Sequence, residues 1–121
     1  MTPLMFLLPL ISCVKSDAVK PELEGKWYLL KVDLFEDNKH SASDSTRETT
    51  YQFCCEDKTN QLIINEDNES RTFLYTYDAV SNSIWLNSKK MFRIEELSLS
   101  RLILTDSYET YKSVYTFARE G

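Results

Sequence analysis

The stretch LEGKWYLLKVDLF, residues 23–35, predicts the first strand of a β-sheet, with its regular part at residues 26–35. Its β-branched, aromatic and aliphatic residues are typical of a strand. Trp27 and Leu29 share one face, but Lys31 and Asp33 follow them on that face, so the apolar side changes partway along. Either a bulge swaps the two faces, or the inner and outer faces are the reverse of those expected.

Sequence patterns typical of strands continue through the rest of the chain. Short runs rich in rings and β-branched residues predict seven more strands, at residues 49–55, 61–65, 71–78, 83–87, 91–96, 101–105 and 111–119. Clusters of Asn, Asp and Ser separate them, such as residues 66–70 and 78–82, and these suit hairpin loops. Residues 36–46 read as a loop, and the interval 94–97 breaks strict alternation, which predicts a bulge. No helical stripe of useful length is present.

Eight consecutive short strands without crossover helices predict an all-β fold, a small antiparallel up-and-down barrel. A meander leaves two open edges unless its first strand pairs with its last, and closure removes both edges. The 121 residues suffice for one domain. Eight strands enclose a space that side chains fill or that holds one small ligand.

Gly25-Lys26-Trp27 resembles the G-x-W motif at the start of the first strand of the lipocalins. Residues 22–121 as a whole resemble the small lipocalin-like (calycin-type) domains of Bacteroidetes lipoproteins, with Leu23, Gly25, Trp27, Phe117 and Arg119 as the matching residues. The resemblance implies that Arg119 lies across Trp27 at the closed end of the barrel, in a structural role. The domain is shorter than secreted lipocalins and lacks their C-terminal helix.

The segment Leu10-Ile11-Ser12-Cys13 closes a short apolar run and resembles the lipobox of bacterial lipoproteins. The resemblance implies a signal peptide at residues 1–12, acylation (such as palmitate) of Cys13, and a lipidated tether at residues 13–21. Two or three acyl chains anchor a protein stably, whereas one does so only marginally. We therefore expect attachment to the outer membrane of a cell envelope, on its periplasmic face or at the cell surface. The alternative is a frayed hydrophobic N-terminus.

Composition argues against several other functions. The net charge is −5 and no basic stripe exists, so nucleic acid is not an expected partner. No cofactor is expected, because Gly-rich phosphate loops are absent. The redox state of adjacent Cys54 and Cys55 stays open, and two cysteines fall short of a zinc site. His40, the only histidine, has no evident nucleophile, and no enzyme is expected.

Two functional classes remain from the sequence. In the first, the barrel binds a small hydrophobic ligand in an aromatic pocket, and the candidate lining residues are Tyr51, Phe53, Phe73, Tyr75, Phe92, Tyr115 and Phe117. The alternative is that these rings only fill the core and contact no ligand. In the second, a solid barrel contacts an envelope protein or inhibits an enzyme, with exposed aromatic residues such as Trp85 as anchors. A cavity above roughly 300 Å³ favours the first class. A filled barrel with an apolar outer patch favours the second.

Overall fold

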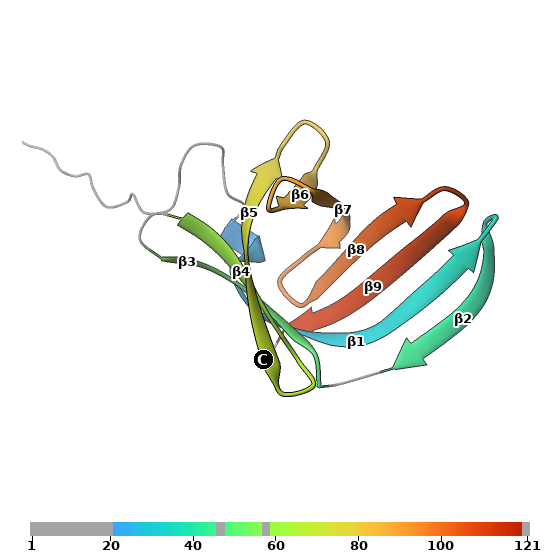
Figure 1. Cartoon of the computed structure of the whole chain (residues 1–121), viewed down its shortest axis with the longest axis horizontal. Helices are drawn as coiled ribbons and strands as arrows, with labels where there is room; N and C mark the ends of the chain where they lie inside the picture. Colours follow the sequence, from blue (N-terminus) through green and yellow to red (C-terminus); the bar gives the residue numbers. More distant parts are fainter. Residues whose placement is uncertain (1–20, 46–47, 57–58, 120–121) are drawn as a thin grey trace, which may run out of the picture.

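The computed structural model describes residues 21–45, 48–56 and 59–119. Within these ranges the chain forms a single turn of 3-10 helix and nine strands (Figure 1). These are η3 (Pro21–Leu23), β1 (Gly25–Glu36), β2 (Lys39–Ser45), β3 (Thr50–Glu56), β4 (Thr59–Glu66), β5 (Glu69–Asp78), β6 (Ser83–Leu86), β7 (Lys90–Leu97), β8 (Arg101–Tyr108) and β9 (Tyr111–Arg119). The predicted signal peptide and the predicted tether up to residue 20 lie outside the described residues.

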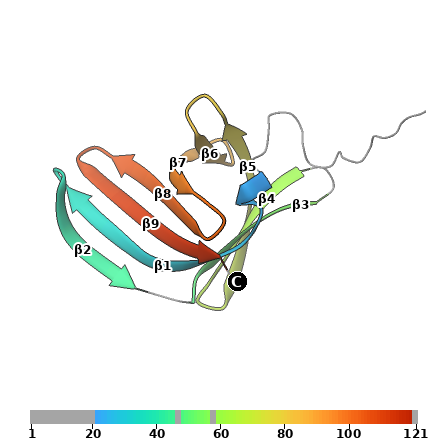
Figure 2. The ribbon, with the colours of Figure 1, turned by 180° about the vertical axis from the view of Figure 1, so that it is seen from behind.

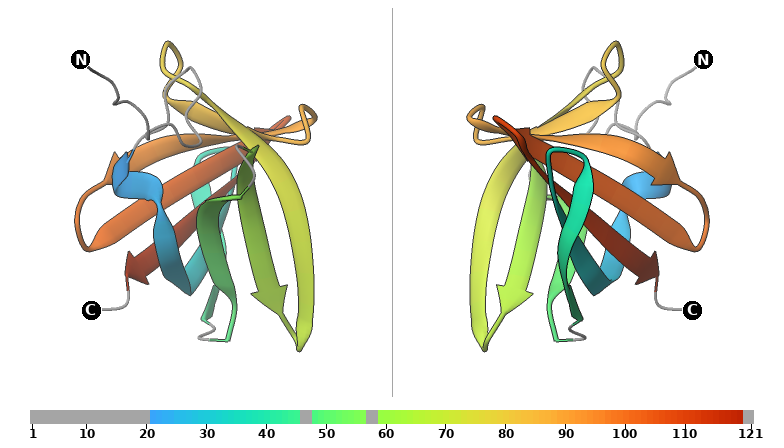
Figure 3. Two further views of the ribbon diagram at one scale, coloured as in Figure 1. Left: turned by 90° about the vertical axis from the view of Figure 1, so that its left-hand side faces the viewer. Right: turned by 90° about the vertical axis from the view of Figure 1, so that its right-hand side faces the viewer.

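The strands form one antiparallel sheet that closes on itself. Their order is β2-β1-β3-β4-β5-β6-β7-β8-β9, and β1 also pairs with β9 from Trp27↔Arg119 to Glu36↔Tyr111. The barrel therefore consists of β1 and β3 to β9, which confirms the predicted eight-stranded up-and-down fold. Figures 2 and 3 show β9 lying beside β1 from behind and from the two sides.

The ninth strand, β2, corrects the loop predicted at residues 36–46. It pairs with the far half of β1 from Lys31↔Ser45 to Glu36↔Lys39, whereas β3 pairs with the near half, residues 25–28. In Figure 1, β2 is the outermost strand on its side of the barrel. The side chains of residues 39–44 are all exposed. A strand with no buried face has no reason to alternate apolar and polar residues, so the usual sequence signal is missing.

A bulge in β1 explains the change of apolar face. The register with β9 shifts between Leu29 and Lys31. Trp27 and Leu29 are buried, Leu30 is 43% exposed, and Val32 packs against the core. Of the two explanations that the sequence left open, the bulge is therefore right. A second register shift, between Ile94 and Glu96 of β7, confirms the bulge predicted at residues 94–97.

Two hairpin turns use aspartate and asparagine at positions where glycine is common. Asp37 and Asn38 between β1 and β2, and Asp67 and Asn68 between β4 and β5, all have positive φ angles. Two consecutive positive φ angles define a type I′ turn, whose twist matches that of the flanking strands. Asn and Asp tolerate this conformation better than other non-glycine residues.

The interior holds one continuous apolar core, to which every barrel strand contributes. Its buried members are Leu23, Trp27, Leu29, Tyr51, Phe53, Leu62, Ile64, Tyr75, Ile84, Leu86, Phe92, Ile94, Leu102, Leu104 and Phe117. Burial of this set supplies the main favourable term for folding, at about 25 cal/mol per Å² of apolar surface.

One end of the barrel is closed by a group that we call the Trp27–Arg119 clamp: these two side chains, Gly25 and the carbonyls of Glu22 and Glu24. The guanidinium carbon of Arg119 lies 4.1 Å from the centroid of the Trp27 ring. Arg119 donates hydrogen bonds to the carbonyl oxygens of Glu24, at 2.7 Å, and of Glu22. The indole Nε1 of Trp27 donates to the carbonyl oxygen of Leu23 at 3.0 Å. The clamp thus joins the last strand to the first strand and to the turn before it.

Gly25 is required where the clamp is tightest. Its φ angle is +121°, and a Cβ atom built on it would lie 2.8 Å from Nη1 of Arg119. A side chain at this position would strain the backbone and push the guanidinium off its carbonyl partners.

We expect Arg119→Ala to lower the free energy of unfolding by about 2–4 kcal/mol, because it removes a cation–π contact and two charge-assisted hydrogen bonds. Gly25→Ala should also lower the free energy of unfolding, because a Cβ atom there strains the backbone and displaces the guanidinium of Arg119. Urea unfolding followed by fluorescence measures both changes. The matched control is Arg71→Ala, which breaks an exposed ion pair with Glu66 and should cost about 0–1 kcal/mol. Equal losses for Arg119→Ala and Arg71→Ala would contradict the role of the clamp.

Candidate functional site

The seven aromatic residues that the sequence nominates for a pocket lie together in the barrel core. Five are buried and two, Phe73 and Tyr115, are partly buried and pack against them. Tyr51 and Phe117 have ring centroids 4.7 Å apart, and Phe53 and Tyr75 have centroids 5.3 Å apart. These spacings are those of rings in direct edge or tilted contact. Ligand contact by these seven residues stays a prediction, but their burial and ring contacts show that they pack together in the barrel interior.

The phenol groups of this cluster are shielded from water. Burial raises the pKa of Tyr51 and of Tyr75 well above the ordinary value of about 10. Burial also raises the pKa of Tyr115, and the neighbouring carboxylate of Asp106 adds to the shift. Tyr115 donates a hydrogen bond from its hydroxyl to Asp106 at 3.4 Å and packs edge-on against Phe92 at 5.5 Å. Tyr115 therefore links the core to a charged group on β8.

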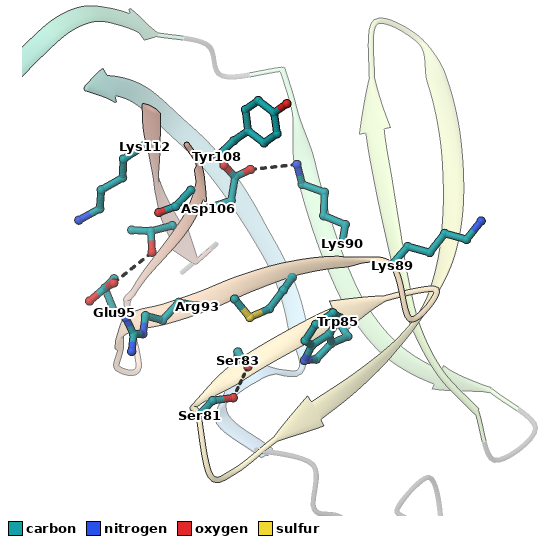
Figure 4. A pocket seen from close by; sticks show the side chains of 13 residues that line it. Ser81, Ser83, Trp85, Lys89, Lys90, Arg93, Glu95, Asp106, Tyr108 and Lys112 are labelled. Atoms are coloured by element: carbon teal, nitrogen blue, oxygen red, sulfur yellow. Dashed lines mark hydrogen bonds and ion pairs between the residues drawn. The ribbon is translucent and has the colours of Figure 1, made fainter. Parts of the chain in front are cut away.

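A groove of about 710 Å³ lies in the barrel wall at the gap where β7 and β8 separate (Figure 4). The ladder between these strands ends at Arg93↔Thr105. Beyond that pair, β7 continues beside β6 alone and β8 beside β9 alone. We call this feature the β7–β8 groove. Its lining residues are Ser81, Ser83, Trp85, Lys89, Lys90, Met91, Arg93, Glu95, Thr105, Asp106, Ser107, Tyr108 and Lys112.

The groove has an apolar part formed by a cross-strand pair. Trp85 on β6 lies directly opposite Met91 on β7, and both side chains are on the outer face, 36% and 41% exposed. Ile84 and Leu86, the neighbours of Trp85 along the chain, are buried. The outward direction that the sequence predicts for Trp85 is therefore correct. Tyr108 adds a further ring, 69% exposed, from the end of β8.

The charged part of the groove is mainly cationic. Lysine or arginine lines it at positions 89, 90, 93 and 112, against two carboxylates, those of Glu95 and Asp106. Lys90 Nζ lies 2.9 Å from Asp106 Oδ2 and bridges the gap that the separating strands leave (Figure 4). Thr105 donates a hydrogen bond to Glu95 at 3.0 Å. Both carboxylates are thus engaged within the groove.

The other candidates from the sequence fall elsewhere. His40 is on β2, with its Nε2 atom 3.1 Å from Asp33 and its ring edge-on to Phe35. The hydrogen bond with His40 is the main cause that lowers the pKa of Asp33, and Ser43 and Lys31 act in the same direction. The acidic residues near position 67 form the β4–β5 turn, where Glu66 pairs with Arg71. Among the described residues, no group of three or more His, Cys, Asp or Glu residues could hold a metal ion.

Sequence reasoning found Trp85 but missed the groove around it. Arg93, Lys112 and Asp106 come from three different strands, and only the point at which β7 and β8 separate brings them together. The predicted bulge at residues 94–97 was the one available signal, because bulges bend a strand and end regular pairing.

The fold defines this protein as a small closed antiparallel β-barrel with one additional outer strand. No known protein-family model matches the chain, and no curated protein is significantly similar to it. In the part of the chain that the structure describes, no helix is long and apolar enough to span a bilayer.

The packing of the phenols predicts a two-phase tyrosine titration. Tyr51 and Tyr75 should remain protonated at about pH 11 in the folded protein and ionise only as it unfolds. Because these groups ionise more easily in the unfolded chain, the free energy of unfolding should fall as the pH rises above about 10. Tyrosinate absorbance, measured beside circular dichroism, tests this. Tyr51→Phe and Tyr75→Phe should each shrink the second phase, and a single smooth phase in the folded protein would mean that the rings line a wet pocket.

Proposed function

We propose that this protein is a non-enzymatic binding module of the cell envelope, held at the outer membrane by an acylated Cys13. Its barrel, which resembles the lipocalin-like type, takes a small hydrophobic ligand at the β7–β8 groove. The alternative, a module that contacts another envelope protein, would use the same surface. The packed core and the exposed Trp85–Met91 pair are the features expected of the second class, a module that contacts a protein. The observation that carries the proposal is the groove of about 710 Å³ beside that pair, because it is large enough for a small ligand.

The barrel interior is a less favourable ligand site than the sequence predicts. Trp27, Phe53 and Phe117 are almost fully buried among other core residues. A ligand entering between such rings must displace contacts that stabilise the fold, and interiors are packed as densely as organic crystals. The close packing of these rings therefore favours a site on the wall over one between them.

The groove has the dimensions and the chemistry of a binding site. Its volume of about 710 Å³ falls within the roughly 300–1,000 Å³ of small-molecule sites. Such sites combine apolar surface with a few polar groups that orient the ligand. The Trp85–Met91 pair supplies the apolar surface, and the surrounding lysines and Arg93 supply the polar groups.

The envelope location is supported by the residues before the barrel. The lipobox-like segment ending at Cys13 would place the lipid, and polar residues 14–21 would separate the barrel from the membrane. A binding module fixed in this way samples ligands at the membrane surface, where amphipathic molecules concentrate.

Absence of catalysis is part of the proposal. His40 is engaged with Asp33 and Phe35 on the exposed β1–β2 hairpin, a different element from those that form the groove. The two groove carboxylates are held by Lys90 and Thr105. Neither arrangement presents an activated nucleophile beside a base.

Mass spectrometry of the natively extracted protein tests the anchor. We expect a mature chain that begins at Cys13 and carries a diacylglyceryl group and an N-terminal acyl chain. Cys13→Ala should move the protein from the membrane fraction to the soluble fraction while the barrel keeps its circular dichroism spectrum. Unmodified full-length chain in the membrane fraction would refute acylation.

Titration with the neutral fluorescent probe N-phenyl-1-naphthylamine tests the groove. Trp85→Ala should weaken binding about tenfold, equivalent to about 1.4 kcal/mol, because the indole provides most of the apolar contact area. The control is Leu74→Ala, which removes an apolar side chain 55% exposed on β5, outside the groove. Unchanged binding in Trp85→Ala would place the site elsewhere. A second experiment replaces Met91 with a photo-crosslinking amino acid. If the wild-type protein binds no probe and this variant captures one discrete envelope protein, the partner is a protein.

A further inference from the structure

We infer that the ligand of the β7–β8 groove is an amphipathic anion, a molecule with an apolar chain and one carboxylate or phosphate head. The inference rests on the proposed function and names the chemical class of its ligand. The chain contacts the Trp85–Met91 pair, and the head is held by Arg93 and the neighbouring lysines.

The charge of the groove is opposite to that of the molecule. The whole chain carries a net charge of −5, yet the groove has an excess of cations over carboxylates. Lys89, Arg93 and Lys112 have no ion-pair partner among the described residues. Like charges held on a shared concave surface repel one another and raise the local positive potential. An anion relieves that repulsion, whereas a cationic ligand adds to it.

The spacing of the apolar and cationic groups suits one small amphiphile. The Trp85↔Met91 pair and the Ser83↔Arg93 pair are successive cross-strand pairs on the outer face of β6 and β7. Alternate residues of a strand are about 7 Å apart. A head group at Arg93 therefore leaves the first carbons of its chain above the Trp85 ring. Figure 4 shows Trp85 and Arg93 lining the same groove.

Asp106 occupies the position of a ligand head beside Lys90. It forms an ion pair with Lys90 and accepts a hydrogen bond from Tyr115. The Lys90–Asp106 pair spans the gap between the separated ends of β7 and β8 (Figure 4). The lysine is 55% exposed, so the pair is accessible to a competing anion. A ligand head can exchange with Asp106 as the partner of Lys90. Asp106 then acts as an internal competitor whose removal should strengthen anion binding.

Three probes with the same ten-carbon chain test the inference: decanoate, decanol and decyltrimethylammonium, each below its micelle concentration and titrated against Trp85 fluorescence. Trp27 is fully buried and serves as a constant background. We expect decanoate to bind at least tenfold more tightly than decyltrimethylammonium, with decanol between them. The preference should weaken with added salt, because screened charges attract less.

Two variants and a control locate the charge effect. Arg93→Gln should weaken decanoate binding about fivefold without changing decanol binding, and Asp106→Asn should strengthen decanoate binding by a similar factor. Arg71→Gln removes the same charge outside the groove and should change neither.

The outcomes separate the inference from the proposed function. If no probe binds, the proposed function of the groove fails. If all three bind equally, or if Arg93→Gln and Arg71→Gln behave alike, the groove binds apolar ligands and the anionic class is refuted. Preference for decanoate that is lost in Arg93→Gln supports both.

Discussion

Contact between Trp27 and Arg119 is the interaction on which the rest of the structure depends. These residues lie opposite each other in the β1–β9 ladder, at the seam where the first barrel strand meets the last. Arg119 covers the indole ring and uses two carbonyl groups of the η3–β1 segment. A meander of this length gains full hydrogen bonding only when its two edge strands meet. The clamp fixes that meeting and its register, because any shift would separate the guanidinium from the ring.

Closure at this size has a direct consequence for function. Eight strands enclose a narrow space, and here rings from β3, β5, β7 and β9 meet within it. The rings in the interior contribute to stability, and under the proposed function the ligand binds at the barrel wall. A wall made only of regularly paired strands has few hollows that could hold a ligand. The separation of β7 and β8 beyond Arg93↔Thr105 provides the exception, and the exposed Trp85–Met91 pair lies beside it.

The alternation of apolar and polar residues predicts those features of the fold that depend on neighbouring positions in the sequence. Strands with one buried face follow from alternation, and the bulge near Glu95 follows from its interruption. The Trp27–Arg119 contact is expected from the resemblance to lipocalin-like domains and not from local pattern. β2 was missed because both of its faces are exposed. The sequence also left the face change in β1 open, since a bulge is settled by the register with β9. The sequence does not predict the groove, because its charged residues come mainly from β7, β8 and β9 and no local signal states where two strands separate.

The end of the β7–β8 ladder also determines which contacts between the two strands a ligand can displace. A backbone ladder is held by many cooperative hydrogen bonds, and a solute cannot replace them one at a time. Beyond Arg93↔Thr105 the strands are joined instead by the ion pair between Lys90 and Asp106. In this pair the side chain of Lys90 is 55% exposed and that of Asp106 is 17% exposed, so an anion can reach the lysine from solvent. Asp106 is also hydrogen-bonded to Tyr115, whose ring packs on Phe92 in the core. An anion bound at Lys90 would therefore disturb a contact that reaches the barrel interior through Tyr115 and Phe92.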